Sequence, residues 1–128
     1  MIVLDSHAWV WWATSSANLS KKAARAIQVD HTVYVSAISC WEVAMLVMKG
    51  RLVFDRDLEV WLDLALKLPG VQLASLSPRI AVRSARLGEG FRGDSADCII
   101  VATALEYGCA IVSKDQRIHS YPHVRSIW

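Results

Sequence analysis

The sequence lacks any uncharged apolar run of the roughly 18 residues that a transmembrane helix needs. It also lacks a basic segment ahead of its first apolar residues, and Asp5 interrupts those residues after Leu4. A secretory signal peptide would need a basic start followed by a longer apolar stretch. These two absences predict a cytoplasmic protein that does not contact a membrane.

Cysteine is scarce, and its pattern suits neither disulfides nor metal. Three cysteines are an odd number, and no two of them have the C-x-x-C spacing of a zinc or redox site. This usage is typical of a reducing compartment, where thiols act as small core residues. The three are Cys40, Cys98 and Cys109.

Several motifs of common enzyme classes are missing as well. The four histidines form no H-E-x-x-H pattern, which argues against a zinc hydrolase. No G-x-S-x-G elbow is present, so a serine hydrolase is poorly supported. There is no Walker A or G-x-G-x-x-G phosphate loop either.

What the chain does have is apolar surface. Its 128 residues are 54% hydrophobic and include six tryptophans, which predicts one domain spanning residues 1–128. So small a domain cannot hide all of this surface, and we expect part of it to meet a partner or a second copy. The net charge of +2 permits nucleic-acid binding without indicating it.

Apolar and helical segments alternate along the chain. Short β-type runs occupy residues 2–4, 32–35, 71–76 and 109–112, with an edge strand at 124–127. Helical patterns lie between them at residues 7–14, 20–29, 39–48, 56–68, 78–87 and 95–107. This alternation predicts an α/β fold with a mostly parallel sheet of four to five strands and helices on both faces.

Acidic residues follow the predicted strands. Asp5 comes directly after the first strand, Glu42 about one helical turn after the second, and Asp115 three residues after the fourth. Asp94 and Asp97 begin a helix on one of its faces. Because sites in parallel sheets form beyond the carboxyl ends of the strands, we expect these side chains to converge.

Converging carboxylates repel one another unless a cation neutralises them. Oxygen-only ligands suit Mg²⁺ or Mn²⁺, which activate water and orient phosphodiesters. The pattern of these five acids therefore predicts metal-dependent phosphodiester hydrolysis. Ser6 and Ser113 flank this site, where a hydroxyl could hold a metal-bound water or orient a carboxylate.

Each of these residues also has a local explanation. Asp5 could cap the following helix, and Asp115 could cap residues 116–118. Ser39-x-x-Glu42 matches a capping box, Asp94-x-x-Asp97 resembles one, and the two serines could make local turn bonds. The remaining acids are expected in turns or on solvated surfaces: Asp30, Asp55, Asp57, Glu59, Asp63, Glu89 and Glu106.

Four blocks of sequence resemble a known family. They are D-S-H at residues 5–7, S-x-x-S-x-W-E at 36–42, GDSADCIIVATA at 93–104 and S-K-D at 113–115. In this order they are similar to the PIN-domain ribonucleases, especially the VapC toxins of bacterial toxin–antitoxin pairs. The resemblance implies a PIN-like three-layer α/β/α fold and Mg²⁺-dependent endoribonuclease activity, with Mn²⁺ able to substitute. Its catalytic and metal-binding acids correspond to Asp5, Glu42, Asp97 and Asp115. Asp94 matches an additional aspartate, which the resemblance adds to the catalytic residues.

The chain departs from the family pattern at three positions. Ser6 stands where threonine is common, which keeps the hydroxyl. Ser95 and Cys98 replace the proline and arginine of the D-P-x-D-R version of the third block. The lost arginine removes a possible partner for a carboxylate or phosphate, so its role in substrate binding is in doubt here.

RNA binding requires phosphate neutralisation. Arg79, Arg83 and Arg86 share one helical face, and Arg92 could border the acidic site, although ordinary solvated charge explains each of them too. The resemblance implies a homodimer, an antitoxin whose tail lies along the cleft, and a hetero-oligomer of the chain with that antitoxin. Apolar residues on nearby segments could receive this tail: Trp9, Trp11, Trp12, Met45 and Met48.

Two other functions stay open. One is a phosphatase-type hydrolase with Asp5 as nucleophile, although such enzymes usually carry a second acid two residues later, where this chain has His7. The other is a non-catalytic PIN-like binding module.

Overall fold

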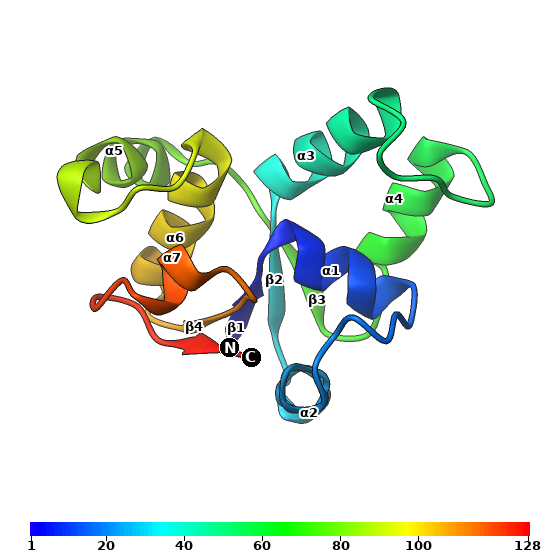
Figure 1. The fold of residues 1–128 in the computed structure, drawn as a ribbon, viewed down its shortest axis with the longest axis horizontal. Coiled ribbons are helices and arrows are strands. Elements are labelled where there is room, and N and C mark those ends of the chain that lie inside the picture. Colours follow the sequence, from blue (N-terminus) through cyan, green and yellow to red (C-terminus); the bar gives the residue numbers. More distant parts are fainter.

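A five-stranded parallel sheet forms the centre of the molecule in the computed structural model (Figure 1). The structure describes residues 1–128 except for the side chain of Glu89, so the solvated charge expected there lies outside the described part. The strand order is β3-β2-β1-β4-β5. The strands are β1 (Ile2–Leu4), β2 (Val33–Ser36), β3 (Val71–Ala74), β4 (Ala110–Val112) and β5 (Ser126–Ile127).

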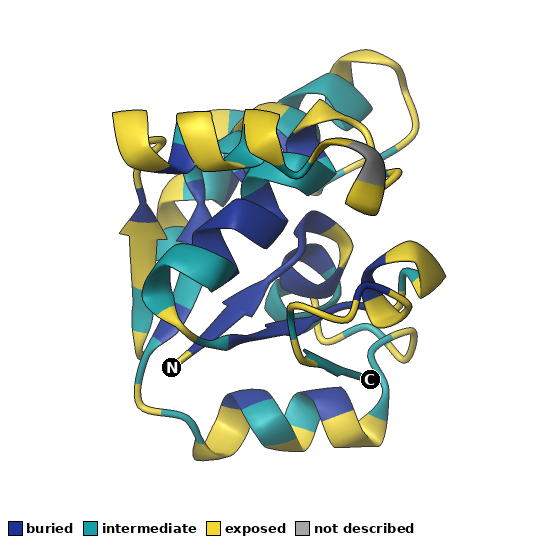
Figure 2. Cartoon of the chain, turned by 90° about the vertical axis from the view of Figure 1, so that its left-hand side faces the viewer, coloured by how far each residue is buried: buried dark blue, intermediate teal, exposed yellow. Residues whose placement is uncertain are grey.

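Helices cover both faces of this sheet. Alternate residues of β1 point to opposite sides, so Ile2 and Leu4 pack in one core and Val3 in the other. The first core includes α1 (Ser6–Ala13), α2 (Lys21–Val29) and α4 (Leu58–Leu66). The second includes α6 (Ser95–Tyr107) and α7 (Gln116–His119), and α5 (Pro78–Arg86) packs on α6. The buried strands between these layers confirm the predicted α/β/α arrangement (Figure 2).

Local capping signals explain the helix bounds. The sequence prediction for α6 is confirmed at both ends, with Asp94 as N-cap and Gly108 closing the helix at a positive φ of 64°. α5 begins at Pro78 after the Ser77 cap, as expected. A short 3₁₀ turn (Gly88–Gly90) joins α5 to α6.

The predicted start of the third helix at Ser39 is wrong. This helix, α3 (Ala37–Met48), leaves β2 directly because the Ser36 side chain accepts the Ile38 N–H at 3.2 Å. Ser39 therefore lies inside the helix and is fully buried, so Ser39-x-x-Glu42 is not a capping box. Glu42 consequently lies in the second turn of α3.

The helix expected over residues 56–68 is shorter than predicted. It begins at Leu58 because the Asp57 carboxylate accepts the Glu59 N–H at 3.1 Å, so Asp57 is an N-cap and not merely a solvated charge. The third strand likewise ends at Ala74, where the chain turns toward the Ser77 cap. Asp30 lies in a turn as expected, and its carboxylate accepts the Thr32 N–H at 3.2 Å.

Trp9 is not available to a partner. Its side chain is 0% exposed, its ring centroid lies 5.4 Å from that of Trp61, and its indole N–H donates to the Ala65 carbonyl at 3.5 Å. Trp9 lies on the side of α1 that packs against α4, which carries both Trp61 and Ala65. Trp41 and Met48 on α3 are instead 57% and 71% exposed.

Within the part of the chain that the structure describes, we find no helix with both the length and the apolar character to cross a membrane. The three cysteines are free thiols.

Candidate functional site

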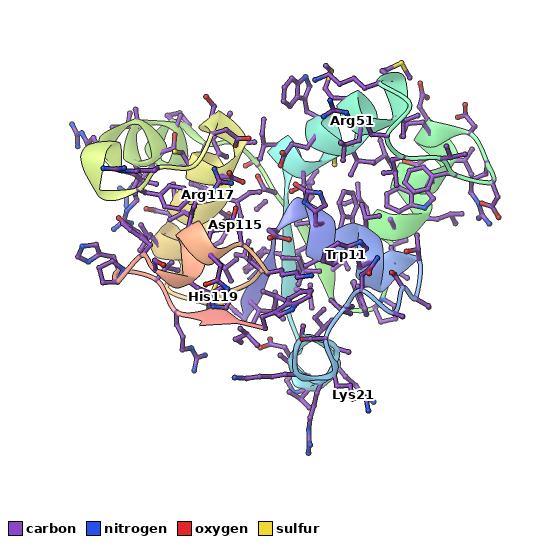
Figure 3. The ribbon with its side chains drawn as sticks, viewed as in Figure 1. Trp11, Lys21, Arg51, Asp115, Arg117 and His119 are labelled. Carbon is purple, nitrogen blue, oxygen red and sulfur yellow. The ribbon has the colours of Figure 1, made fainter. Side chains whose placement is uncertain are left out.

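The acidic residues lie at the ends of elements that leave the same edge of the sheet. β1, β2 and β4 are parallel neighbours, and α1, α3 and the Ser113–Asp115 loop follow their carboxyl ends. The N-terminal end of α6 comes to this edge because α6 packs against α3 and β1. Asp115 directly precedes α7 and Arg117 lies within it, and their side chains are side by side (Figure 3).

Asp5 is both a helix cap and part of this edge. One carboxylate oxygen, Oδ1, accepts the Ala8 N–H at 2.8 Å, as the capping explanation predicts. The residue is only 9% exposed, and its pKa is raised because burial disfavours the charged form. The Ser113 hydroxyl opposes this rise by hydrogen bonding. Capping therefore engages one oxygen of a carboxyl group that faces other acids.

Glu42 is hydrogen-bonded to Ser6, which is itself hydrogen-bonded to Ser39. The Ser6 hydroxyl donates to Glu42 Oε1 at 2.6 Å, and the hydroxyls of Ser6 and Ser39 are hydrogen-bonded at 2.8 Å. Burial raises the pKa of Glu42, the Ser6 hydrogen bond lowers it, and the charges of Asp94 and Asp5 raise it further. Ser6 thus orients the Glu42 carboxylate and does not merely make a local turn bond.

Asp94 and Asp97 form a reciprocal capping box at the start of α6. Asp94 Oδ1 accepts the Asp97 N–H at 2.8 Å, and Asp97 Oδ2 accepts the Asp94 N–H at 3.3 Å. The local pattern recognised in the sequence is therefore present. Burial, and then the neighbouring Asp94 charge, raise the pKa of Asp97 to about 6.

Asp115 caps α7 through the Arg117 N–H at 2.8 Å. Its own N–H donates to the Ser113 hydroxyl at 3.0 Å, so Ser113 makes the local bond that the turn explanation predicts and also affects Asp5. Hydrogen bonds from Arg117 hold the pKa of Asp115 below its usual range. His119 supports this loop from behind, with Nε2 2.6 Å from the Ser113 carbonyl oxygen.

Each of the three acids with a raised pKa is influenced by the charge of another acid at this edge of the sheet. Asp5 is affected by Asp115, Glu42 by Asp94 and Asp5, and Asp97 by Asp94 and Glu42. Their crowding without a divalent cation favours protonation of the buried members. We call this set the acidic cluster: Asp5, Glu42, Asp94, Asp97 and Asp115.

Arg117 is the residue that sequence reasoning missed. Its Nη2 lies 2.9 Å from Asp97 Oδ2 and 2.6 Å from Asp115 Oδ2. Among the described side chains, Arg117 alone forms ion pairs with the cluster. The family pattern places an arginine at position 98, where this chain has Cys98. Here Arg117 of α7 supplies a guanidinium partner for the acids instead. The only signal in the sequence is an arginine two residues after Asp115.

The basic residues proposed for substrate binding lie in two places. Arg79 and Arg83 pair with Glu106 at 3.4 and 2.9 Å. Glu106 is nine residues beyond Asp97 on α6, about 14 Å along the helix. These two arginines thus face the end of α6 that is remote from the cluster. Arg79, Arg83 and Arg86 line one groove together with Glu106. Arg92 lines a different pocket, beside Arg117.

The donors fit a hard divalent cation that keeps part of its water shell. In the part of the chain that is described, no three or more His, Cys, Asp or Glu side chains meet as a ready metal cage. Mg²⁺ commonly binds through one or two carboxylates and several waters, so it does not require such a cage. The cluster supplies oxygen donors alone, and a bound cation would oppose the rise in the pKa values of Asp5, Glu42 and Asp97.

Comparisons with known proteins agree with this fold. The family model described as PIN domain matches residues 2–124. The chain is 34% identical to Ribonuclease VapC22 of Mycobacterium tuberculosis over 126 residues, covering 98% of this chain and 95% of the relative.

Two solved structures share the fold at low sequence identity. VapBC2 from Rickettsia felis, bound to a promoter DNA fragment, has a TM-score of 0.73 at 16% identity, covering 98% of this chain and 97% of that one. DNA-bound VapBC from Salmonella typhimurium has a TM-score of 0.68 at 15% identity, covering 98% and 95%. Because the family model and the VapC22 relative both extend over nearly the whole chain, the chain belongs to the PIN-domain family.

Proposed function

We propose that this chain is an Mg²⁺-dependent endoribonuclease that acts as the toxin of a toxin–antitoxin pair. The observation that carries the proposal is the convergence of Asp5, Glu42 and Asp97, which are far apart in sequence, with pKa values raised by burial. Structural carboxylates are normally neutralised or solvated, and perturbed clusters are typical of functional sites. The ribonuclease relative supports RNA as the substrate.

The chain's residues have distinct roles in this proposal. Asp5, Glu42, Asp97 and Asp115 would hold the cation, which when bound supplies a lowered pKa for the attacking water and positive charge near the leaving oxygen. The Ala8 N–H fixes one oxygen of Asp5, and the Ser6 hydroxyl fixes one oxygen of Glu42. Asp94 holds the start of α6 and thereby the position of Asp97. Ser113 orients the loop that carries Asp115.

An antitoxin and a second copy of the chain are the proposed protein partners. Solved neighbours of this fold include VapBC assemblies, which supports a peptide partner of that type. Trp41 and Met48 expose apolar surface on α3, the helix that carries Glu42. A peptide on this surface would lie close to the acidic cluster and could block RNA.

The test is cleavage of total RNA with mapping of the new ends. The purified wild type with Mg²⁺ should cut at defined positions, and both excess EDTA and Asp97→Asn should abolish the cuts. Expression should arrest growth for the wild type and not for the variant. Full cleavage in EDTA, or by folded Asp97→Asn, would falsify the proposal.

The two alternatives predict different results. A phosphatase with Asp5 as nucleophile would form an aspartyl-phosphate, yet Asp5 is 9% exposed and already hydrogen-bonded at Oδ1. A non-catalytic module would bind no divalent cation, so calorimetric titration with Mn²⁺ separates it from the nuclease.

A further inference from the structure

Arg117 occupies the acidic cluster with an unusual number of contacts for an exposed residue. Its Nε lies 3.1 and 3.2 Å from the two carboxylate oxygens of Asp115, and its Nη2 lies 2.6 Å from Oδ2. The same Nη2 reaches Asp97 Oδ2 at 2.9 Å. One nitrogen therefore bridges a carboxylate of α6 and the N-cap carboxylate of α7, and its positive charge lies between two proposed cation ligands.

This contact is easily reversed. The Arg117 side chain is 50% exposed, whereas those of Asp97 and Asp115 are 17% and 25% exposed. An ion pair with one partner in solvent contributes little net stability. A divalent cation carries twice the charge of a guanidinium and can approach the oxygens more closely, so it can displace Arg117 from them.

Arg117 also lines a pocket of about 350 Å³ whose lining contains neither Asp97 nor Asp115. Arg92, Gln116 and Ser120 contribute hydrogen-bond donors to its wall. Arg92 forms no ion pair with any side chain that the structure describes. A guanidinium leaving Asp97 would thus enter a pocket that already carries a second cation and suits an anionic group.

We propose that Arg117 is a phosphate-binding residue held on Asp97 and Asp115 until a divalent cation binds, and that the cation releases it toward this pocket to meet a phosphate of the RNA. The inference rests on the proposed nuclease function. Planar, forked arginine is well suited to both partners, since it binds carboxylates and phosphates in the same bidentate manner. Arg117 would then be a substrate-positioning residue whose availability depends on metal binding.

The proposal has two linked consequences. Because the guanidinium and the cation compete for the same carboxylates, removing Arg117 should tighten cation binding. Because the released guanidinium binds phosphate, the cation should tighten RNA binding in the wild type through Arg117, and this coupling should be reciprocal.

The first experiment is calorimetric titration of the full chain with Mn²⁺. Arg117→Gln should bind Mn²⁺ about tenfold more tightly than the wild type, and Arg117→Lys should fall between them. Arg56→Gln is the matched control, because it removes the same charge from an exposed pair with Asp55, outside the cluster. The control should bind Mn²⁺ with wild-type affinity, and circular dichroism should show that all the variants are folded.

The second experiment measures binding of a hydrolysis-resistant phosphorothioate RNA oligonucleotide by fluorescence anisotropy, in EDTA and in Mn²⁺. Mn²⁺ should tighten RNA binding by the wild type and by Arg56→Gln, while Arg117→Gln should lose most of this gain. Equal or weaker Mn²⁺ affinity in Arg117→Gln overturns the proposal, as does an undiminished gain in RNA affinity. If either result is found while the wild type still binds Mn²⁺ and cleaves RNA, only the Arg117 proposal fails and the nuclease function stands. Absence of Mn²⁺ binding and of cleavage in both proteins overturns both.

Discussion

The Ser6 hydroxyl donates a 2.6 Å hydrogen bond to Glu42 and so joins the helix after β1 to the helix after β2. This bond lowers the pKa of Glu42 against the effect of burial. Ser6→Ala should therefore raise the pKa of Glu42 and move the acid limb of the cleavage rate upward by about one pH unit. A pH–rate profile measures the shift. Ser6→Thr keeps the hydroxyl and should keep the wild-type profile.

The capping role of Asp5 can be separated from its proposed catalytic role by two substitutions. Asp5→Asn retains an oxygen for the Ala8 N–H, so its unfolding free energy should stay near that of the wild type while cleavage is lost. Asp5→Ala loses the cap as well and should be less stable than Asp5→Asn by about 1 kcal/mol. Urea unfolding and an RNA cleavage assay provide the two measurements. Equal activity of Asp5→Asn and the wild type would contradict the assignment.

Asp97 should make the metal-free protein less stable as pH rises. Its folded pKa of about 6 is above the model-compound value of 3.8, so the folded state binds the extra proton between these values. The stability associated with that proton is fully present below about pH 4 and is lost as pH rises through about 6. In EDTA at pH 7.5, Asp97→Asn should be more stable than the wild type by about 1 kcal/mol, because partial exposure and Arg117 reduce the full effect.

Denaturation series at pH 4 and pH 7.5 test this expectation. The advantage of Asp97→Asn should shrink to a small part of its pH 7.5 value at the lower pH, where Asp97 is protonated in the folded state and roughly half protonated in the unfolded state. A stability difference that does not change with pH would show that Asp97 is not the titrating group.

Truncation of Trp9 should lower the free energy of unfolding strongly, whereas truncation of Trp41 should hardly change it. Trp9 is 0% exposed against Trp61, so Trp9→Ala should lower the free energy of unfolding by about 4 kcal/mol. Trp41 is 57% exposed, and Trp41→Ala should change it by less than about 0.5 kcal/mol. Chemical denaturation measures both values. A large loss for Trp41→Ala would show that this side chain packs in the fold.

Local signals account for what the sequence predicts well. The span of α6 is predicted because Asp94 and Gly108 are caps whose effect depends only on neighbouring residues. The start of α3 was predicted wrongly because Ser39-x-x-Glu42 imitates a capping box, while the actual cap is Ser36 at the end of β2. The burial of Trp9 was not predicted because SHAWVWWA is apolar on several sides, so no periodicity identifies the buried one.

The residues of the site, too, differ in whether the sequence predicts their position. The edge of the sheet that gathers Asp5, Glu42 and Asp115 can be inferred from the alternation of strands and helices. The position of Arg117 cannot be inferred in this way, because its contact with Asp97 depends on how α7 packs beside α6. Neither element encodes that placement locally.

The place of β1 in the sheet has a consequence during synthesis. Although β1 is made first, Leu4 pairs with Val35 on one side and with Val112 on the other, and Val112 pairs in turn with Ile127. A nascent chain can therefore complete neither the central strand's pairing nor the placement of Asp115 until β4 and the residues that follow it have emerged from the ribosome. Chains that end before β4 would lack both the β1–β4 pairing and Asp115, and so would lack an assembled acidic cluster.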